Sequence, residues 1–315
     1  MKLGYYPGCS LNGTAKEFNS SLREVFDELN VDLEELNDWS CCGATSAHVT
    51  SHILSVALPA RNLVLAKKQG LKELLAPCAA CYSRLVSSQR ELKLDEKMRM
   101  KVEDLLEEKV TNGLQIINLI QVFQKIGLDK LKENKKVDIS KIKAACYYGC
   151  LLVRPVDIAL PDDMESPDSM EAIIKSIGGK TVDWNFKTEC CGAAHSIAHT
   201  DIVEKLCKGI IDNAEKHGAD VIIVACPMCH SNLDMRQLNI MKHFPGHKPI
   251  PVLYLSQLIG LAMGINEKRL GLGVHYINTK PLIDKIKGVD LPHEVKKEAP
   301  APPVPNEKIK KGVEA

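Results

Sequence analysis

A cysteine pattern that occurs twice constrains this chain more than any other feature. Residues 40–48 (SCCGATSAH) and 189–197 (ECCGAAHSI) each place two adjacent cysteines before a glycine. In each half a single cysteine precedes this pair and a CxxC motif follows it. Neighbouring cysteines close a disulfide only through a strained ring, so the pattern indicates ligands rather than a disulfide framework. The repeated cysteines are Cys9, Cys41, Cys42, Cys78 and Cys81 in the first half, and Cys150, Cys190, Cys191, Cys226 and Cys229 in the second.

Composition and charge exclude several classes of protein. With 315 residues, 45% of them hydrophobic, the chain can form two globular domains or one domain of two similar halves. A formal net charge of +1 lacks the basic excess that nucleic acids and anionic membranes select. The longest apolar stretch, residues 252–265, is too short to span a bilayer, and the start has no apolar signal region. We therefore expect a cytoplasmic protein without a membrane span, in which twelve cysteines serve as metal ligands or reactive thiols.

Strand and helix signals alternate around the cysteines. Apolar stretches that end near Cys9, Cys78, Cys150 and Cys226 are typical of buried parallel strands. A helix follows each double cysteine, one from Ser51 to Gly70 and the other from about Thr200 to Gly218. Residues 114–127 and 253–265 are each predicted as a closing helix. The sequence thus predicts an α/β fold with two pseudo-symmetric, Rossmann-like β-α-β-α-β repeats and mainly parallel sheets.

The predicted organisation has four segments. We expect one repeat over residues 1–128, a linker over 129–143, a second repeat over 144–285 and a proline-rich flexible tail over 286–315. Residues 91–110 are predicted as a charged amphipathic helix on the surface of the first repeat. Carboxyl ends of parallel strands share one edge of a sheet, so the five cysteines of each repeat should converge there.

Five thiolates in each half exceed the needs of common metal sites. Structural zinc takes four ligands, and an ordinary iron–sulfur cubane takes four cysteines, usually from a tight cysteine run. A nonstandard multi-iron cluster with an additional thiolate fits the count better. A zinc site remains an alternative, as does a thioredoxin-like redox pair at either CxxC motif. Cys146 and Cys207 have no counterpart in the repeat and are predicted as core residues.

In this arrangement the chain resembles the CCG-domain family, and over roughly residues 1–285 it is similar to the B subunits of CoB–CoM heterodisulfide reductases of methanogenic archaea. The resemblance implies one noncubane [4Fe-4S] cluster on the five cysteines of each half. It also implies reduction of the disulfide CoM-S-S-CoB to coenzyme M and coenzyme B thiols, the last step of methanogenesis. Two clusters, each taking one sulfur of the disulfide, would give the repeat a chemical purpose.

Other residues near the cysteines are weaker candidates for function. Protons for the two thiols could come from His195 or His230, or from His48 and His52. The anionic groups of the substrate could contact Lys187, Arg84 or Arg61. Each of these side chains also has an ordinary structural explanation, such as a helix cap or a solvated surface charge. The two tryptophans, Trp39 and Trp184, precede the CCG motifs and either shield the clusters or anchor the core.

The chain contains no Gly-rich nucleotide fingerprint, no P-loop and no ferredoxin-like cysteine run, so we expect no flavin or nucleotide on it. The resemblance implies that electrons arrive from two partners of the heterodisulfide reductase complex, the C subunit with cubane iron–sulfur clusters and the A subunit with flavin and iron–sulfur clusters. It also implies electron bifurcation together with a hydrogenase or formate dehydrogenase. Two alternatives remain open. One is a CCG-type iron–sulfur subunit of another oxidoreductase, such as a thiol:fumarate reductase, a succinate dehydrogenase or a glycolate or lactate oxidase. The other is a zinc-stabilised interaction scaffold.

Overall fold

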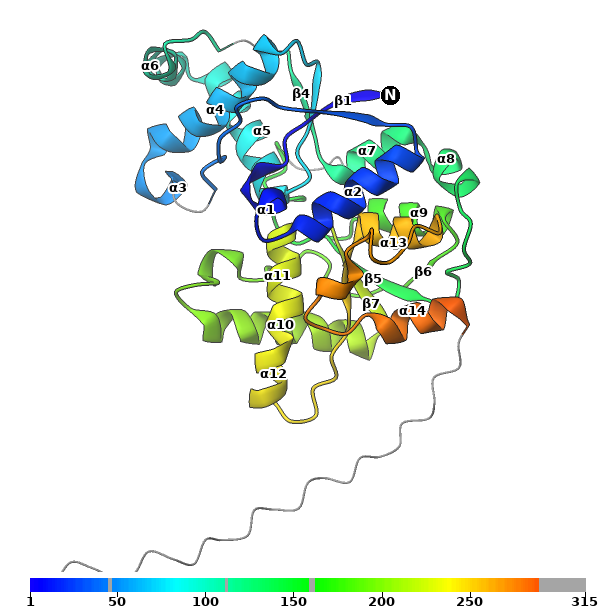
Figure 1. Cartoon of the computed structure of the whole chain (residues 1–315). Helices are drawn as coiled ribbons and strands as arrows, with labels where there is room; N and C mark the ends of the chain where they lie inside the picture. The colour runs from blue at the N-terminus through cyan, green and yellow to red at the C-terminus, as the bar shows by residue number, and fades with distance from the viewer. Residues whose placement is uncertain (45–46, 111–112, 159–161, 289–315) are drawn as a thin grey trace, which may run out of the picture.

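The computed structural model describes residues 1–44, 47–110, 113–158 and 162–288. These residues form two α/β halves that lie one above the other in Figure 1. Each half contains a four-stranded sheet, and every pair of neighbouring strands is parallel. The predicted α/β fold with two pseudo-symmetric, mainly parallel repeats is therefore confirmed.

Strands alternate with one or two helices in both halves. The first half comprises β1 (Lys2–Tyr5), α1 (Gly8–Asn12), α2 (Lys16–Glu28), β2 (Asp32–Glu35), α3 (Ala47–Thr50), α4 (His52–Lys68), β3 (Glu73–Leu75), α5 (Ala79–Leu94), α6 (Glu96–Leu106), β4 (Gln115–Ile117), α7 (Leu119–Ile126) and α8 (Leu128–Glu133). The second comprises β5 (Lys143–Tyr147), α9 (Ser169–Ser176), β6 (Lys180–Thr181), the 3-10 helix η1 (Ala193–His195), α10 (Thr200–Lys216), β7 (Val221–Val224), α11 (Pro227–Met235), α12 (Gln237–His243), β8 (Val252–Tyr254), α13 (Leu255–Ala262), the 3-10 helix η2 (Leu272–Val274) and α14 (Lys280–Lys287).

The strand orders, β2-β1-β3-β4 and β6-β5-β7-β8, match between the halves. Each sheet has one strand more than the β-α-β-α-β pattern provides. The additional strands β4 and β8 begin the two segments that were expected to be wholly helical. Their apolar residues pair with β3 and β7 before the chain turns into α7 and α13. The alternation of strand and helix was thus predicted correctly, but the fourth strand of each sheet was not.

The helices after the double cysteines lie where the sequence predicts them. α4 begins after Ser51, whose hydroxyl oxygen accepts the Leu54 N–H, and it ends just before Gly70, which has a φ of +78°. α10 starts at Thr200, and Gly218, with a φ of +74°, follows its end. A positive φ strains residues with a Cβ, so glycine provides the turn that leads into the next buried strand.

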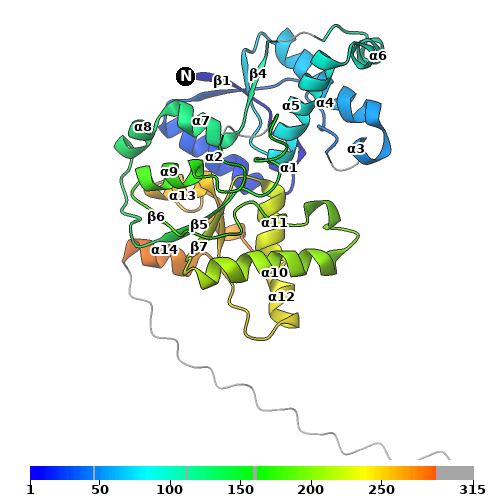
Figure 2. The same cartoon turned by 180° about the vertical axis from the view of Figure 1, so that it is seen from behind.

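The two halves share one hydrophobic core. Buried residues of both sheets belong to a single apolar cluster, and every residue of α13 is buried. At the seam α13 packs against α2, where the hydroxyls of Ser21 and Ser256 lie 2.8 Å apart. The rings of Phe18 and Tyr254 stack nearby with centroids 4.1 Å apart. Figure 2 shows α2, α9 and α13 gathered between the two sheets. This seam fixes the halves relative to each other.

Three further expectations concern the ends of the repeats. α8 occupies the start of the expected linker 129–143, and the backbone N–H groups of Lys136 and Val137 donate to the Ala262 carbonyl. The amphipathic helix expected over 91–110 is present as the end of α5 and as α6, with a break at Asp95. Most of the expected tail 286–315 lies outside the described residues. Within the described ranges, none of the helices is both long and apolar enough to cross a bilayer.

Candidate metal centre

The five cysteines of each half follow the carboxyl ends of three strands. In the first half Cys9 follows β1, the double cysteine follows β2, and Cys78 follows β3. The chain leaves β1 toward β2 on one side and returns on the other side at β3, so β1 and β3 flank the topological switch point of the sheet. Open parallel sheets bind ligands at this position. The second half repeats the arrangement around β5 and β7.

Sulfur atoms that are distant in sequence lie close together within each half. In the first group Cys42 Sγ lies 3.4 Å from Cys81 Sγ, and Cys41 Sγ lies 3.9 Å from Cys9 Sγ. In the second group the sulfurs of Cys191 and Cys229 are 3.6 Å apart. All twelve cysteines carry free thiols. The structure thus brings the predicted ligands of each half toward one another without disulfide bonds.

Two glycines, one in each half, make room for these sulfurs. Gly8 has a φ of +65°, and a Cβ there would lie 3.0 Å from Cys81 Sγ. Gly149 has a φ of +66°, and a Cβ there would lie 3.1 Å from Cys229 Sγ. In both halves the backbone before the first cysteine therefore passes so close to the second CxxC sulfur that only glycine fits without strain.

Backbone amides support the first sulfur of each double cysteine. The Gly43 N–H donates to Cys41 Sγ at 3.4 Å, and the Gly192 N–H donates to Cys190 Sγ at 3.3 Å. Hydrogen bonding from the Cys150 thiol, reinforced by the backbone amides, lowers the pKa of Cys190 to about 6 against the opposing effect of burial. At the equivalent position of the first half, hydrogen bonding with Cys42, and then burial, raises the pKa of Cys41, so only the amide contact is common to both halves.

A repeated tyrosine ties the CCG loop to the first strand of each sheet. The Tyr6 hydroxyl donates to the Ser40 carbonyl at 2.8 Å, and the Tyr147 hydroxyl donates to the Glu189 carbonyl at 2.6 Å. Trp39 and Trp184 pack against these tyrosines, with ring centroids 5.6 and 6.4 Å away. Of the two roles expected for the tryptophans, this packing corresponds to anchoring the core. Both tyrosines belong to a motif that the sequence repeats, YYPGC in the first half and YYGC in the second. This repeat is the sequence signal for the tyrosine tether, the hydrogen bond from each of these tyrosines to the CCG loop.

The two cysteine groups meet across the seam. The Cys226 thiol interacts with the Cys78 thiol and raises the pKa of Cys78 well above its usual range. Hydrogen bonding from Cys229, and then from Cys78, lowers the pKa of Cys226. Both thiols are buried. The first cysteines of the two CxxC motifs therefore lie near enough across the seam to shift each other's pKa.

The spacing of the sulfurs bears on what they can bind. A tetrahedral zinc ion, with zinc–sulfur bonds of about 2.3 Å, places its sulfur ligands about 3.8 Å apart. Among the described residues, the only trio of metal-binding side chains within 4.8 Å of one another is His230, Asp234 and His275. The described sulfurs thus approach in pairs, but no three of them surround a point as closely as one zinc ion requires. The thiols of each half form a cysteine-rich donor set of the kind that binds iron–sulfur groups.

The other two cysteines lie outside both groups. Cys146 is fully buried within β5, and Cys207 is fully buried on α10. The Cys207 thiol donates to the Cys191 carbonyl at 3.6 Å. Both side chains occupy the core positions that the sequence predicts for them.

Four histidines were singled out as proton donors, and the structure places them differently. His48 and His195 are exposed, and His195 lies beside His199 with ring centroids 5.6 Å apart. His52 is exposed and contacts Glu91, with 2.8 Å between Nε2 and Oε1. His230 alone is buried, directly after Cys229. It is therefore the only one of the four within the interior that surrounds the sulfurs.

Gln257 organises the surroundings of His230. Its Oε1 accepts the Tyr254 N–H at 2.9 Å, which fixes the amide so that its NH₂ group faces His275 Nε2 at 2.9 Å. Consequently His275 carries its proton on Nδ1, which lies 3.1 Å from His230 Nε2. If a metal ion bound Nδ1 of His275, the ring proton would have to sit on Nε2 of His275. There it would face the NH₂ group of Gln257, which is also a donor. His230 Nε2 also lies 3.0 Å from the Val252 carbonyl, so these side chains form a hydrogen-bond network.

Asp234 fixes the segment that carries His275. Its carboxylate oxygens accept the N–H groups of Tyr276 at 2.7 Å and Ile277 at 3.0 Å. Burial raises the pKa of Asp234 to about 6 and lowers the pKa of His275 to about 4. The sequence interpretation missed both residues, because His275 lies far from His230 along the chain and has no counterpart in the first half.

Two of the three proposed cationic contacts are already paired. Lys187 Nζ forms a buried ion pair with Glu171 at 2.7 Å, and its side chain is only 8% exposed. The Tyr148 hydroxyl donates to the same carboxylate at 2.5 Å. Arg61 donates to the carbonyl and the carboxylate of Asp38. In contrast, Arg84 on α5 is half-buried and makes no hydrogen bond or ion pair with the described residues.

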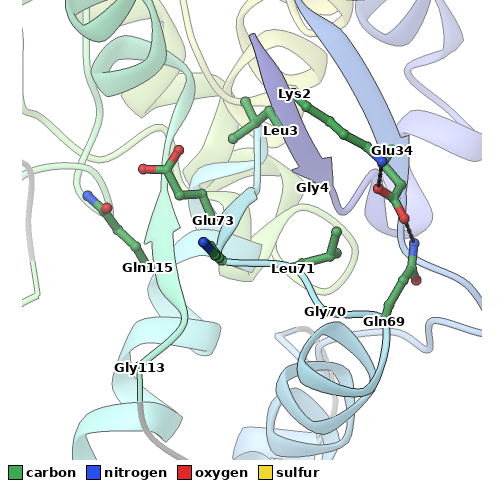
Figure 3. Close-up of a pocket in the computed structure, with 11 residues that line it drawn as sticks. Lys2, Leu3, Gly4, Glu34, Gln69, Gly70, Leu71, Glu73, Gly113 and Gln115 are labelled. Carbon is green, nitrogen blue, oxygen red and sulfur yellow. Dashed lines mark hydrogen bonds and ion pairs between the residues drawn. The ribbon is translucent and has the colours of Figure 1, made fainter.

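A shallow cavity of about 590 Å³ lies at the other edge of the first sheet. Figure 3 shows its lining at the amino ends of β1, β3 and β4, whereas the cysteines follow the carboxyl ends of the strands. There Lys2 pairs with Glu34 at 2.7 Å, and Gln69 donates to the same carboxylate at 2.9 Å. These polar groups satisfy one another. The edge that carries the sulfurs is the one where parallel sheets bind ligands.

Comparison with known proteins places the chain in a family. The CCG cysteine-rich domain matches residues 3–86 and 144–234, and the chain belongs to this family. It is 31% identical to the 8-methylmenaquinol:fumarate reductase membrane anchor subunit of Wolinella succinogenes, over 89% of this chain and 99% of that one. It is 29% identical to the B subunit of the ferredoxin:CoB-CoM heterodisulfide reductase of Methanosarcina mazei, over 90% of this chain and 97% of that one. These relatives are subunits of oxidoreductases.

Among solved structures, a hypothetical protein from Helicobacter pylori is similar with a TM-score of 0.70. The alignment covers 87% of this chain and 51% of that one, at 15% identity. This similarity supports the fold alone.

Proposed function

We propose that this chain is the cluster-bearing catalytic subunit of a disulfide-reducing oxidoreductase of the heterodisulfide reductase type. Cys9, Cys41, Cys42, Cys78 and Cys81 would hold one noncubane [4Fe-4S] cluster, and Cys150, Cys190, Cys191, Cys226 and Cys229 a second. The substrate is CoM-S-S-CoB, and the products are the thiols of coenzyme M and coenzyme B. The similarity to a heterodisulfide reductase B subunit over 90% of the chain supports this proposal.

One observation carries the proposal more than any other: each half brings a CCG cysteine against its CxxC cysteine, Cys42 to 3.4 Å from Cys81 and Cys191 to 3.6 Å from Cys229. Reduction of a disulfide needs two electrons and two protons, and it yields two thiols. Two clusters side by side would supply the electrons one at a time and would accept both sulfurs. The backbone glycines and tyrosine tethers hold the ligands of the two groups in the same way, so both halves can contribute. His195 and His230 stay predictions as proton donors.

Electrons would come from partner proteins, since the sequence has no nucleotide fingerprint and no cubane-type cysteine run. By similarity, the donors are a C subunit with cubane clusters and an A subunit with flavin. These in turn would be supplied by a hydrogenase or formate dehydrogenase in an electron-bifurcating complex. The cytoplasmic location of this complex stays a prediction.

Anaerobic purification followed by iron and sulfide analysis tests the proposal. We expect a brown protein with about eight irons per chain, the content of two four-iron clusters. Addition of CoM-S-S-CoB or a free thiol to the oxidised protein should change the electron paramagnetic resonance signal of the clusters. A colourless protein that contains zinc and no iron would contradict the proposal. A cluster signal that changes with neither CoM-S-S-CoB nor the free thiol would contradict it as well.

A second function is favoured by one comparison. The relative from Wolinella succinogenes is named for methylmenaquinol and fumarate, and it covers nearly the same length of chain. In that function the two cysteine groups would pass electrons between partners without binding a disulfide. Clusters that are reduced by a menaquinol analogue, and whose signal stays unchanged with CoM-S-S-CoB, would identify this alternative.

A further inference from the structure

Arg84 stands beside the first cysteine group without a partner among the described residues. It lies on α5, three residues after Cys81, and is half-buried. Helical side chains lean toward the amino end of their helix, and residues three or four apart are neighbours on its surface. Arg84 therefore lies on the same face of α5 as Cys81, one turn beyond the end of the CxxC motif.

The lack of a partner sets Arg84 apart. The chain has eight arginines, and the seven others each form an ion pair or a hydrogen bond within the described residues; they are Arg23, Arg61, Arg90, Arg99, Arg154, Arg236 and Arg269. A guanidinium stays charged in proteins and carries five N–H donors. None of the Arg84 nitrogens is buried away from solvent, so its N–H groups are available to an anionic ligand.

The equivalent position in the second half is fully occupied. Asn232 lies three residues after Cys229, as Arg84 does after Cys81. Asn232 Nδ2 donates to the Cys191 carbonyl at 3.0 Å, and its Oδ1 accepts the Ser196 hydroxyl at 2.9 Å. The second half thus uses this position to secure its own CCG loop, whereas the first half places there a cation that the described residues leave unpaired.

Arg84 also lies close to where the second half crosses α5. Arg90, further along the same helix, forms an ion pair with Asp157 at 2.7 Å. Asp157 belongs to the segment after Cys150, which carries the exposed apolar side chains of Leu151 and Val156. Arg84 is therefore on the part of α5 between the first cysteine group and this contact with the second half.

We propose that Arg84 binds the anionic group of the thiol whose sulfur reaches the first cysteine group. The inference rests on the function proposed above and assigns the charge recognition to one half only. A sulfonate, carboxylate or phosphate can accept two N–H groups of the guanidinium fork. The substrate class is accordingly a disulfide in which at least one half is a short, negatively charged thiol.

The test compares two thiols of equal chain length that differ in charge. The probes are 2-mercaptoethanesulfonate and 2-mercaptoethanol, titrated into the oxidised, cluster-loaded protein while the electron paramagnetic resonance signal is followed. Arg84→Gln should weaken the response to the sulfonate by about tenfold or more, because a hydrogen-bonded charge pair is lost. It should leave the response to the neutral thiol and the thiol-free signal unchanged. Arg84→Lys should retain part of the preference for the sulfonate.

Arg99→Gln is the matched control, because Arg99 lies on α6 and pairs with Glu96 at 3.0 Å, away from the cysteines. Equal loss of response to both thiols in Arg84→Gln, or no loss, would overturn the role of Arg84 while the proposed function stands. A changed thiol-free signal without a change in thiol preference would also overturn it, because Arg84 would then act on the cluster. A wild-type protein that responds to neither thiol would overturn the proposed function, and this inference with it.

Discussion

In the first half Tyr6 ties the CCG loop to β1, and in the second half Tyr147 makes the same bond to β5. The side chains around these shared devices differ. Three residues before its double cysteine, the first half has Asp38 in an exposed pair with Arg61, whereas the second has Lys187 in a buried pair with Glu171. The backbone and the thiols are duplicated, and the polar groups next to them are not. The comparison indicates that both halves bind the same kind of group but present it to different surroundings.

The strongest test of this comparison removes one ligand from each half in turn. Cys42→Ser and Cys191→Ser each delete a buried sulfur that lies within 3.6 Å of a CxxC cysteine. If each group holds its own cluster, iron should fall from about eight to about four per chain in either variant. Cys146→Ala is the control, because Cys146 is a core residue of β5 outside both groups. Loss of all iron in either single variant would mean that the two groups share one assembly.

The next test addresses the difference in charge next to the double cysteines. Lys187→Met would leave Glu171 buried without its cation, and loss of one partner of a buried pair costs about 3–5 kcal/mol of unfolding free energy. Asp38→Asn breaks the exposed pair at the equivalent position, where the carboxylate side chain is 76% exposed, and asparagine tolerates the φ of +52° found there. It should cost no more than about 1 kcal/mol. Unfolding midpoints in denaturant would compare the two, and equal losses would contradict the buried character of the Lys187 pair.

The cysteine pattern allowed much of the scaffold to be predicted. The order of single cysteine, double cysteine and CxxC located the ends of β1, β3, β5 and β7, since a strand that carries a ligand must end at the sheet edge. β4 and β8 were missed because their apolar residues run into α7 and α13 without a glycine or proline between them. In the first half Asn118 and Gln121 form a capping box that marks this boundary, but Tyr254 stands at the corresponding place in the second.

The surroundings of the cysteines could not be predicted from the sequence, because they depend on contacts between distant elements. Glu171 neutralises Lys187 only through the packing of α9, so the sequence alone does not reveal that this lysine is already paired. His275 reaches His230 through a segment that has no equivalent in the first half. Repetition reveals what the halves share. Residues that belong to one half alone carry no such signal.

A third test asks whether the glycines beside the sulfurs are required by space as well as by backbone conformation. Gly149→Ala places a Cβ 3.1 Å from Cys229 Sγ at a φ of +66°, whereas Gly218→Ala has a similar φ of +74° but no atom within 4 Å. The left-handed conformation alone costs about 1–2 kcal/mol in both variants. Only Gly149→Ala should also reduce iron bound to the second group. Thermal midpoints and iron per chain distinguish the two effects, and equal iron content would argue against the steric requirement.

The smallest expected effect is a pH dependence of the unfolding free energy, and it arises in the second half. The first half has Tyr82 at the position of His230 and Val86 at the position of Asp234. Asp234 has its pKa raised to about 6, so its contribution to stability is present below its unfolded value of 3.8 and is lost as pH rises through 6. His275 has its pKa lowered to about 4, so its contribution is present above its unfolded value of 6.5 and is lost as pH falls through 4. Between pH 4 and 6 the two slopes therefore oppose each other.

The wild-type unfolding free energy should consequently change little from this pair over that interval. His275→Gln removes the histidine slope and leaves that of Asp234, so the stability of this variant should fall with rising pH by up to about 1 kcal/mol per unit. His217→Gln, on the exposed end of α10, is the control and should leave the wild-type profile unchanged. Thermal midpoints at pH 4, 5 and 6 provide the measurement. A His275→Gln profile parallel to that of wild type would show that burial does not shift the two groups in opposite directions, and the asymmetry between the halves would then be one of packing and not of charge.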